Sequence, residues 1–122
     1  MDKLERLLIL REIDDLAIHY WDEVDRNRGA NAHNLFTEDC TLATSQKVRK
    51  GRAAVKEFYD SRVARGDRIA RHMIGNRKIT IHDRDTVSTV WVLMHYAADG
   101  QWRYRSRLTT PLFKDYDTAT TG

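Results

Sequence analysis

The sequence has little of what builds disulfide-bonded, zinc-bound or membrane-spanning folds. Its one cysteine, Cys40, cannot form an internal disulfide, and no cysteine pair offers a zinc site. A single proline, Pro111, leaves little room for proline-rich linkers. No apolar run approaches the roughly 18 residues of a membrane span. The N-terminus turns acidic at Asp2 and Glu5, too soon for a signal peptide, so we expect a cytoplasmic protein without a membrane partner.

The chain has 122 residues, which predicts a single domain over residues 1–122. Hydrophobic residues make up 41% and charged residues 32%, a balance typical of a globular chain rather than a disordered one. The net charge of +3 is uneven, because residues 47–78 hold 11 basic and 3 acidic side chains. These basic residues have no interleaved aromatics, so we interpret them as a solvated face or a rim that attracts a small anion, and expect no nucleic-acid partner.

The first half of the chain has the apolar spacing of helices. A stripe at i, i+3, i+4 predicts a long first helix that Asp2 and Glu5 cap and that ends at Asn27–Gly29. The residues expected on its buried face are Leu4, Leu7, Leu8, Ile13, Leu16, Ala17, Tyr20, Trp21 and Val24. The segments expected after it are a short helix over 31–36, a strand over 39–44 and a second helix over 51–65.

From Arg71 onward the period changes to two, which indicates strands. The apolar face switches near Gly75, and this predicts a bulge. A tight turn over 82–85, a long strand over 86–98 and a hairpin at Asp99-Gly100 lead to an alternating strand over 101–109. Helices followed by an antiparallel meander predict an α+β domain with a curved sheet around the first helix.

The two turns predict which residues share a sheet face. If Asp99-Gly100 is a two-residue loop, His95 lies opposite Tyr104; if residues 83–84 form another, His72 lies opposite His95. Directly opposite residues project to the same face, so His72, His95 and Tyr104 form a row. Trp91 shares this face, whose composition suits a buried or pocket-lining surface. The other face carries both arginines and apolar residues, which favours a homo-oligomer (dimer or trimer) built on that face.

Asp25 is a candidate general base. It lies at the edge of the apolar stripe and near the C-terminus of the first helix, where the helix dipole disfavours a negative charge. The alternative interpretation is structural: a solvated helix end for Asp25, and hydrogen-bonded histidines at positions 72 and 95. Tyr20 and Tyr59 are then amphipathic core residues. No glycine-rich phosphate loop or metal motif occurs, and no local spacing supports a metal, so we expect neither metal nor cofactor.

Several segments, taken together and in order, resemble the SnoaL-like branch of the nuclear-transport-factor-like superfamily, which includes scytalone dehydratase. The resemblance covers residues 4 to 98 and implies a cone-shaped α+β fold. In that fold a curved antiparallel or mixed sheet wraps around a long helix and encloses an apolar pocket. The segments that carry it are Tyr20 with Val24-Asp25, residues 35–39, residues 51–59 and Arg71-His72 with Asn76.

The resemblance implies a cofactor-independent lyase or isomerase, dehydratase-like, acting on a hydrophobic cyclic carbonyl or hydroxyl compound. Asp25 and His72 match the family's Asp–His pair, in which the histidine takes the proton and the aspartate orients it. Tyr20 matches a tyrosine of bile-acid dehydratase and would hydrogen-bond the developing enolate oxygen. The residues expected to line the pocket are Trp21, Tyr59, Asn76, Trp91, His95 and Tyr104.

The C-terminal part departs from this family pattern, in which two more long strands usually follow. Either residues 102–107 form the last strand, or residues 111–116 match the segment before it. In both cases the pocket is more open or is completed by a neighbouring subunit. The alternative function is therefore a non-catalytic ligand-binding or subunit-assembly domain of the same fold.

Overall fold

A computed structural model describes residues 1–66, 69–98 and 106–109. The predicted order, with both longer helices before a meander of antiparallel strands, is confirmed, and two short strands lie between those helices. Among the described residues, no helix combines the length and apolar character that a bilayer crossing requires. The elements in chain order are α1 (Lys3–Arg26), η1 (Ala32–Leu35), β1 (Thr41–Ala43), β2 (Val48–Lys50), α2 (Arg52–Val63), β3 (Ile69–Asp83), β4 (Thr86–Ala98) and β5 (Ser106–Thr109).

The helix α1 begins and ends at the predicted signals. The Asp2 carboxylate accepts the Glu5 backbone N–H at 2.8 Å, and the Glu5 carboxylate accepts the Asp2 backbone N–H at 3.0 Å. This reciprocal capping box satisfies donors that have no partner within the helix. At the other end Asn27 is the C-cap, and Gly29 follows with φ of +77°.

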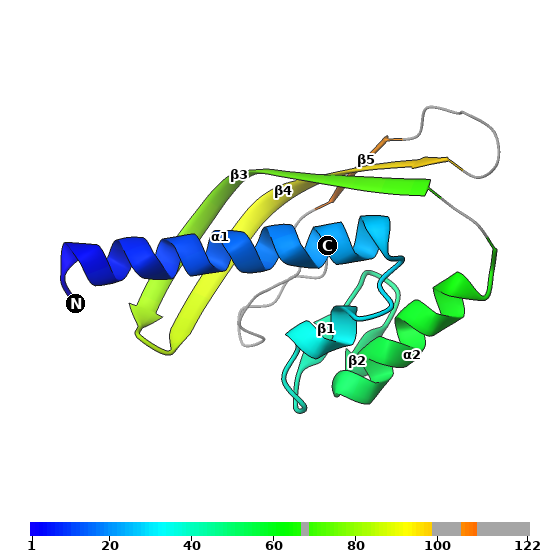
Figure 1. Ribbon diagram of the computed structural model, residues 1–122, viewed down its shortest axis with the longest axis horizontal. Helices are drawn as coiled ribbons and strands as arrows, with labels where there is room; N and C mark the ends of the chain where they lie inside the picture. The colour runs from blue at the N-terminus through cyan, green and yellow to red at the C-terminus, as the bar shows by residue number, and fades with distance from the viewer. Residues whose placement is uncertain (67–68, 99–105, 110–122) are drawn as a thin grey trace.

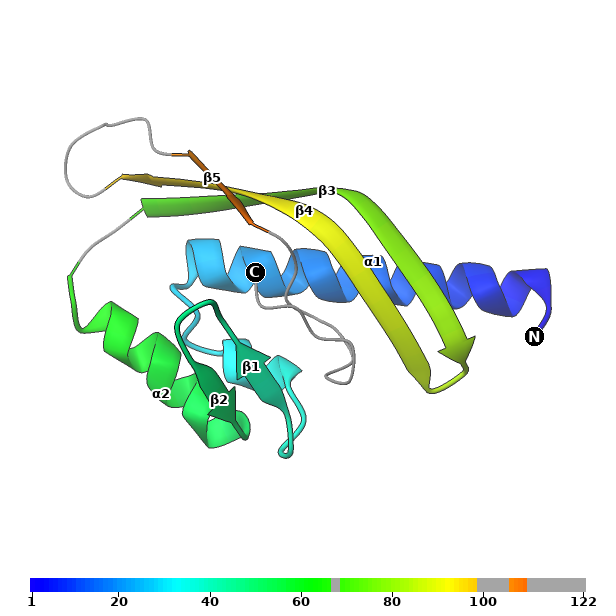
Figure 2. The same cartoon turned by 180° about the vertical axis from the view of Figure 1, so that it is seen from behind.

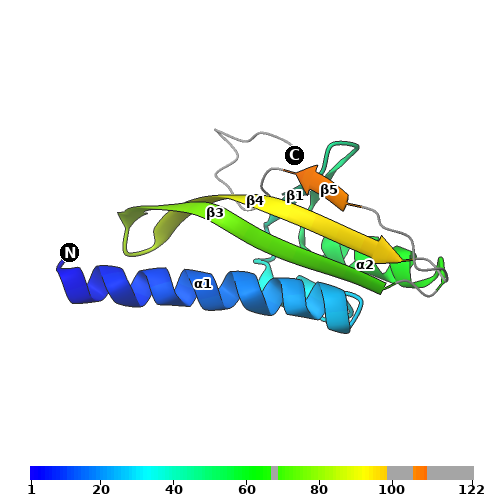
Figure 3. The ribbon, with the colours of Figure 1, turned by 90° about the horizontal axis from the view of Figure 1, so that it is seen from above.

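Two antiparallel sheets, β1–β2 and β3–β4–β5, complete the described fold. The β3–β4 pair runs along α1 for most of the helix length (Figure 3). The helices η1 and α2 and the small sheet gather beside the C-terminal half of α1 (Figure 1). Both long strands bend midway toward the N-terminal half of α1, as Figure 2 shows from behind. The layer formed by η1, α2 and the β1–β2 sheet therefore covers the C-terminal half of α1 and not its N-terminal half (Figure 1).

The predicted bulge near Gly75 is confirmed. Gly75 pairs with Val92 and Lys78 pairs with Val90, so Asn76 and Arg77 together oppose the single residue Trp91. Asn76 takes up the irregular backbone with φ of +48°, a conformation that asparagine tolerates better than most residues. The bulge accounts for the bend in the sheet, because an extra residue on one strand increases local twist.

The predicted pairing of His72 with His95 is confirmed, although the turn that led to it differs. The turn residues are Arg84 and Asp85, and Asp83 pairs with Thr86. The two register shifts, at Gly75/Lys78 and Ile81/Asp83, together cancel the displaced turn. The displaced turn therefore leaves the pairing of His72 with His95 unchanged.

The predicted pairing of His95 with Tyr104 is wrong. His95 pairs with Arg107, and Tyr96 pairs with Ser106. The predicted turn at Asp99-Gly100 lies outside the described residues. Tyr104 itself lies outside the described residues.

Among the described residues, the buried core lies beside the C-terminal half of α1. The prediction of a buried stripe along all of α1 is wrong at its first half, where Leu4, Leu7 and Leu8 are exposed by 65%, 53% and 56%. Leu16 is exposed as well. The N-terminal half of α1 is exposed because α2 and η1 do not extend alongside it (Figure 1). The buried core cluster consists of Ala17, Tyr20, Trp21, Val24, Ala32, Leu42, Val55, Tyr59, Trp91 and Leu93.

Candidate active site

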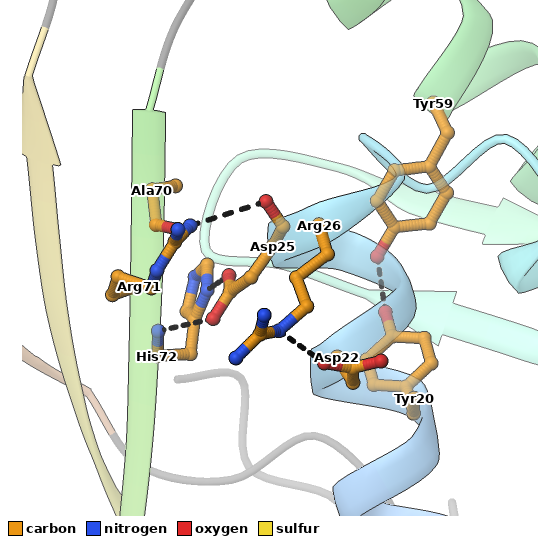
Figure 4. A network of polar contacts seen from close by, with 8 residues as sticks. All are labelled: Tyr20, Asp22, Asp25, Arg26, Tyr59, Ala70, Arg71 and His72. Atoms are coloured by element: carbon orange, nitrogen blue, oxygen red, sulfur yellow. Dashed lines mark hydrogen bonds and ion pairs between the residues drawn. The ribbon is translucent and has the colours of Figure 1, made fainter.

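Asp25 and His72 form a buried, doubly bonded pair between α1 and β3 (Figure 4). The His72 backbone N–H donates to Asp25 Oδ2 at 2.7 Å, and His72 Nδ1 lies 2.5 Å from Asp25 Oδ1. Each side chain is only 8% exposed. Both carboxylate oxygens are therefore engaged by one histidine, which holds the imidazole in a single orientation.

The tautomer of His72 follows from these bonds. A carboxylate is an acceptor only, so the short contact requires a proton on Nδ1 when His72 is neutral. The other nitrogen, Nε2, then carries the lone pair and can accept a proton from a ligand. After protonation at Nε2, the adjacent carboxylate stabilises the imidazolium. The pair thus has the parts of a general base and its orienting partner.

The His72 ring stacks against two other rings. Trp21 from α1 lies 4.4 Å from it, centroid to centroid, with an interplanar angle of 23°. His95 from β4 lies 4.3 Å from it at 5°, as the register of the two strands requires. These rings hold the imidazole by its faces, so exchange with a ligand occurs at its edge.

A backbone contact also reaches the pair. Arg71 Nη1 donates to the Asp25 carbonyl oxygen at 3.3 Å and to the Ala70 carbonyl oxygen at 2.7 Å (Figure 4). Asp25 is in the last turn of α1, where carbonyl groups have no partner within the helix. Arg71 therefore ties the end of α1 to β3 next to the carboxylate.

Tyr20 does not join this pair. Its hydroxyl makes a short hydrogen bond with the Tyr59 hydroxyl of α2, on the other side of α1 from His72 (Figure 4). Helix α1 is continuous through residues 20 to 25, so the two side chains keep the separate directions that an ideal helix gives them. The tyrosine pair is buried, and it joins α1 to α2.

Burial raises the pKa of Tyr20 well above its ordinary value of 10.0 and also raises that of Tyr59. In the unfolded chain both phenols ionise near pH 10, whereas the folded protein keeps them protonated at higher pH. The unfolded state then binds fewer protons, so the free energy of unfolding decreases as the pH rises above about 10. Below that pH the pair contributes its stability in full.

We therefore expect the melting temperature to fall more steeply between pH 9 and 11 for the wild type than for Tyr59→Phe, which removes one of the two phenols. Tyr20→Phe should behave in the same way. Thermal unfolding followed by circular dichroism across this pH range measures both slopes. Equal slopes for the wild type and both variants would contradict the assignment of the alkaline loss to this pair.

The other residues predicted to line the pocket lie in different surroundings. Trp91 is 3% exposed and lies in the core with Trp21 and Tyr59. Asn76 is an exposed residue of the bulge. Tyr104 is outside the described residues. Within the part of the chain that the structure describes, no cluster of three histidine, cysteine or acidic side chains could hold a metal ion.

Two features of the site had no signal in the sequence. The stack of Trp21 on His72 joins residues of α1 and β3 that no spacing relates. The contact between Arg71 and the Asp25 carbonyl spans 46 positions. Both depend on how α1 docks on the sheet.

Comparisons with known proteins agree with this fold. A family model described as a SnoaL-like domain matches residues 5–110. A candidate scytalone dehydratase from Novosphingobium aromaticivorans is 20% identical, with a TM-score of 0.73, and the match covers 93% of this chain and 80% of that one.

Two further solved structures share the fold. The β subunit of a candidate aromatic-ring-hydroxylating dioxygenase from the same organism is 16% identical, with a TM-score of 0.70 over 95% of this chain and 84% of that one. LinA is 15% identical, with a TM-score of 0.66 over 100% of this chain and 99% of that one. No curated protein matches the sequence.

Proposed function

The chain belongs to the SnoaL-like domain family, and from that premise we propose that it is a cofactor-independent lyase or isomerase. Its substrate is a hydrophobic cyclic carbonyl or hydroxyl compound. The observation that carries the proposal is the buried Asp25–His72 pair, in which one histidine engages both carboxylate oxygens. A buried pair of this kind supports proton transfer better than it supports stability, because each group costs free energy to remove from water.

The proposed reaction begins with His72 Nε2 removing a proton from a carbon next to the substrate carbonyl. The electrons of that C–H bond form the C=C bond of an enolate, and the carbonyl oxygen becomes negative. In a dehydration the enolate re-forms the carbonyl and expels a β-hydroxyl group, which leaves as water with the proton from His72. In an isomerisation His72 instead returns the proton to a more distant carbon.

The apolar surroundings favour this chemistry. Trp21, which stacks on His72, is buried in the core cluster with Trp91 and Leu93, so the local dielectric constant is low. Charge interactions between the Asp25 carboxylate and a developing imidazolium are stronger there than in water. A hydrophobic substrate also gains free energy by leaving water for such a site.

A two-part screen of the purified chain tests the proposal. Cyclic β-hydroxy ketones that lose water become enones, whose ultraviolet absorbance reports dehydration. With 1-tetralone in D2O, proton abstraction exchanges the hydrogens next to the carbonyl, and proton NMR follows their loss. Rates above the uncatalysed reaction support the proposal, and no acceleration in either part of the screen contradicts it.

A second candidate function is subunit assembly, with a second copy of this chain as the partner. The sheet face directed away from α1 exposes Ile69, Met73 and Val90 by 48%, 52% and 46%. One structure of the same fold is a β subunit, a protein named for its place in an assembly. Exposed apolar residues grouped on one face are typical of an interface.

For this assembly we expect Met73→Glu to convert a homo-oligomer to a monomer, because a buried interface would then hold an unpaired charge. Light scattering coupled to gel filtration measures the change. Thr80→Glu, an exposed position farther along the same strand, is the matched control and should leave the mass unchanged. A wild-type chain that is monomeric at all concentrations would remove the assembly function.

A further inference from the structure

The indole N–H of Trp21 is a buried hydrogen-bond donor. The residue is 7% exposed, and its indole Nε1 is buried with no acceptor among the residues that the structure describes. An indole N–H can only donate, and buried donors in native proteins almost always have a partner. An unsatisfied donor in a protein core is destabilising, so its presence calls for an explanation.

The Trp21 indole ring lies next to the proposed general base, which explains a donor without an acceptor among the described residues. Trp21 stacks on His72 with 4.4 Å between ring centroids, and it precedes Asp25 by one helical turn. The indole N–H therefore belongs to the same small region as the nitrogen that would take the substrate proton. In a carbonyl substrate the carbon that loses a proton and the carbonyl oxygen are only two bonds apart. A base and a donor to that oxygen must be neighbours, as these two rings are.

The residue expected to donate to that oxygen is engaged elsewhere. The Tyr20 hydroxyl bonds to Tyr59 on the other side of α1. Trp21 is the next residue along the helix, and its ring contacts both the Tyr20 ring, at 4.8 Å between centroids, and the His72 ring, at 4.4 Å. The step from Tyr20 to Trp21 rotates the side chain about 100° around the helix, toward β3.

We propose that the Trp21 indole N–H donates a hydrogen bond to an oxygen of the substrate next to the carbon deprotonated by His72. This inference rests on the proposed function and narrows its substrate to compounds whose reacting carbon adjoins a carbonyl. The donor stabilises the enolate oxygen as negative charge develops on it. A purely hydrocarbon or halogenated ring has no acceptor of comparable strength for it.

The experiment uses the indole N–H signals of the 15N-labelled protein, in which Trp21→Phe identifies the Trp21 signal among those of the three tryptophans. One ligand is 1-tetralone, and the matched ligand is 1-methylenetetralin, which replaces the carbonyl oxygen by CH2. We expect 1-tetralone to move the Trp21 indole proton downfield in a saturable way, and the hydrocarbon to move it little. A saturable shift that is equal for both ligands, that affects only other tryptophans, or that is absent for both would overturn the proposal.

Binding to the Trp21→Phe variant provides an independent test, since phenylalanine keeps a ring against His72 and lacks the N–H. We expect the Kd of 1-tetralone to rise about tenfold, the usual weight of one hydrogen bond, and that of 1-methylenetetralin to stay constant. Equal changes for both ligands would contradict the proposal. Neither readout requires turnover, so a failure here is distinguishable from loss of the Asp25–His72 mechanism, which the turnover of His72 variants reports.

Discussion

Replacing His72 with alanine lowers turnover of an accepted cyclic ketone by about a hundredfold or more, which is the expected loss when a general base is removed. The reason is specific to the geometry. Asp25 holds Nδ1, so Nε2 is the nitrogen that accepts the proton. Among the described histidines, His72 is the one whose ring contacts the Asp25 carboxylate, while His95 stacks on the face of His72. Steady-state rates of dehydration or hydrogen exchange measure the effect.

Asp25→Asn should cause a loss of similar size through the tautomer of His72. The carboxylate now accepts two bonds from His72, one at each oxygen. An asparagine has only one acceptor oxygen, which the His72 backbone N–H can retain, and its NH2 group then faces Nδ1. That arrangement favours a proton on Nε2, and the base loses its lone pair.

The matched control for both variants is His82→Ala. His82 is an exposed residue near the far end of β3, and its Nε2 contacts the Ser88 hydroxyl at 2.7 Å. Its removal should leave turnover unchanged. If His72→Ala and Asp25→Asn fold normally, by circular dichroism, and retain wild-type rates, then the proton-transfer role of the pair is wrong.

The parts of the fold that the sequence predicts are those set by near neighbours in the chain. The capping box of Asp2 and Glu5, the end of α1 at Asn27 and the long strand β4 each depend on residues a few positions apart. The small strand β2 escaped prediction because it has three residues and acquires its structure by pairing with β1. Burial along α1 was wrong in its first half because it depends on where α2 lies.

The site divides along the same line. The His72–His95 pairing could be predicted from strand lengths, because a turn displaced along the chain was offset by bulges. The partnership of Asp25 with His72 spans 47 positions and was available only through the family resemblance. Tyr20 shared that resemblance, yet the continuous helix directs it to Tyr59. A residue type at the family's position therefore does not determine where its side chain points.

The second large expected effect is on the free energy of unfolding, and it comes from a glycine in the loop that follows α1. Gly29 has φ of +77°, and a Cβ added there would lie 2.6 Å from Cγ and 2.9 Å from Cε1 of the Tyr59 ring, with Cδ1 closer still. Tyr59 is 5% exposed and bonded to Tyr20, so its ring has little freedom to move away. We expect Gly29→Ala to lower the free energy of unfolding by about 3 kcal/mol or more, from left-handed backbone strain plus overpacking. Urea denaturation followed by tryptophan fluorescence measures it.

Substitutions at two other glycines separate the contributions of backbone strain and of overpacking to this loss of stability. Gly66 also has positive φ, +110°, but a Cβ there meets nothing within 4 Å, so Gly66→Ala reports the backbone strain alone, about 1–2 kcal/mol. Gly75→Ala, without a positive φ and in open space, should change stability least. The remaining difference belongs to the Tyr59 ring and should shrink when Gly29→Ala is made in a Tyr59→Ala background, since the ring atoms are then absent. If Gly29→Ala and Gly66→Ala lower the free energy of unfolding by the same amount, the Tyr59 ring does not restrict position 29. The packing of that ring against Gly29 is then not the cause of the expected loss of stability.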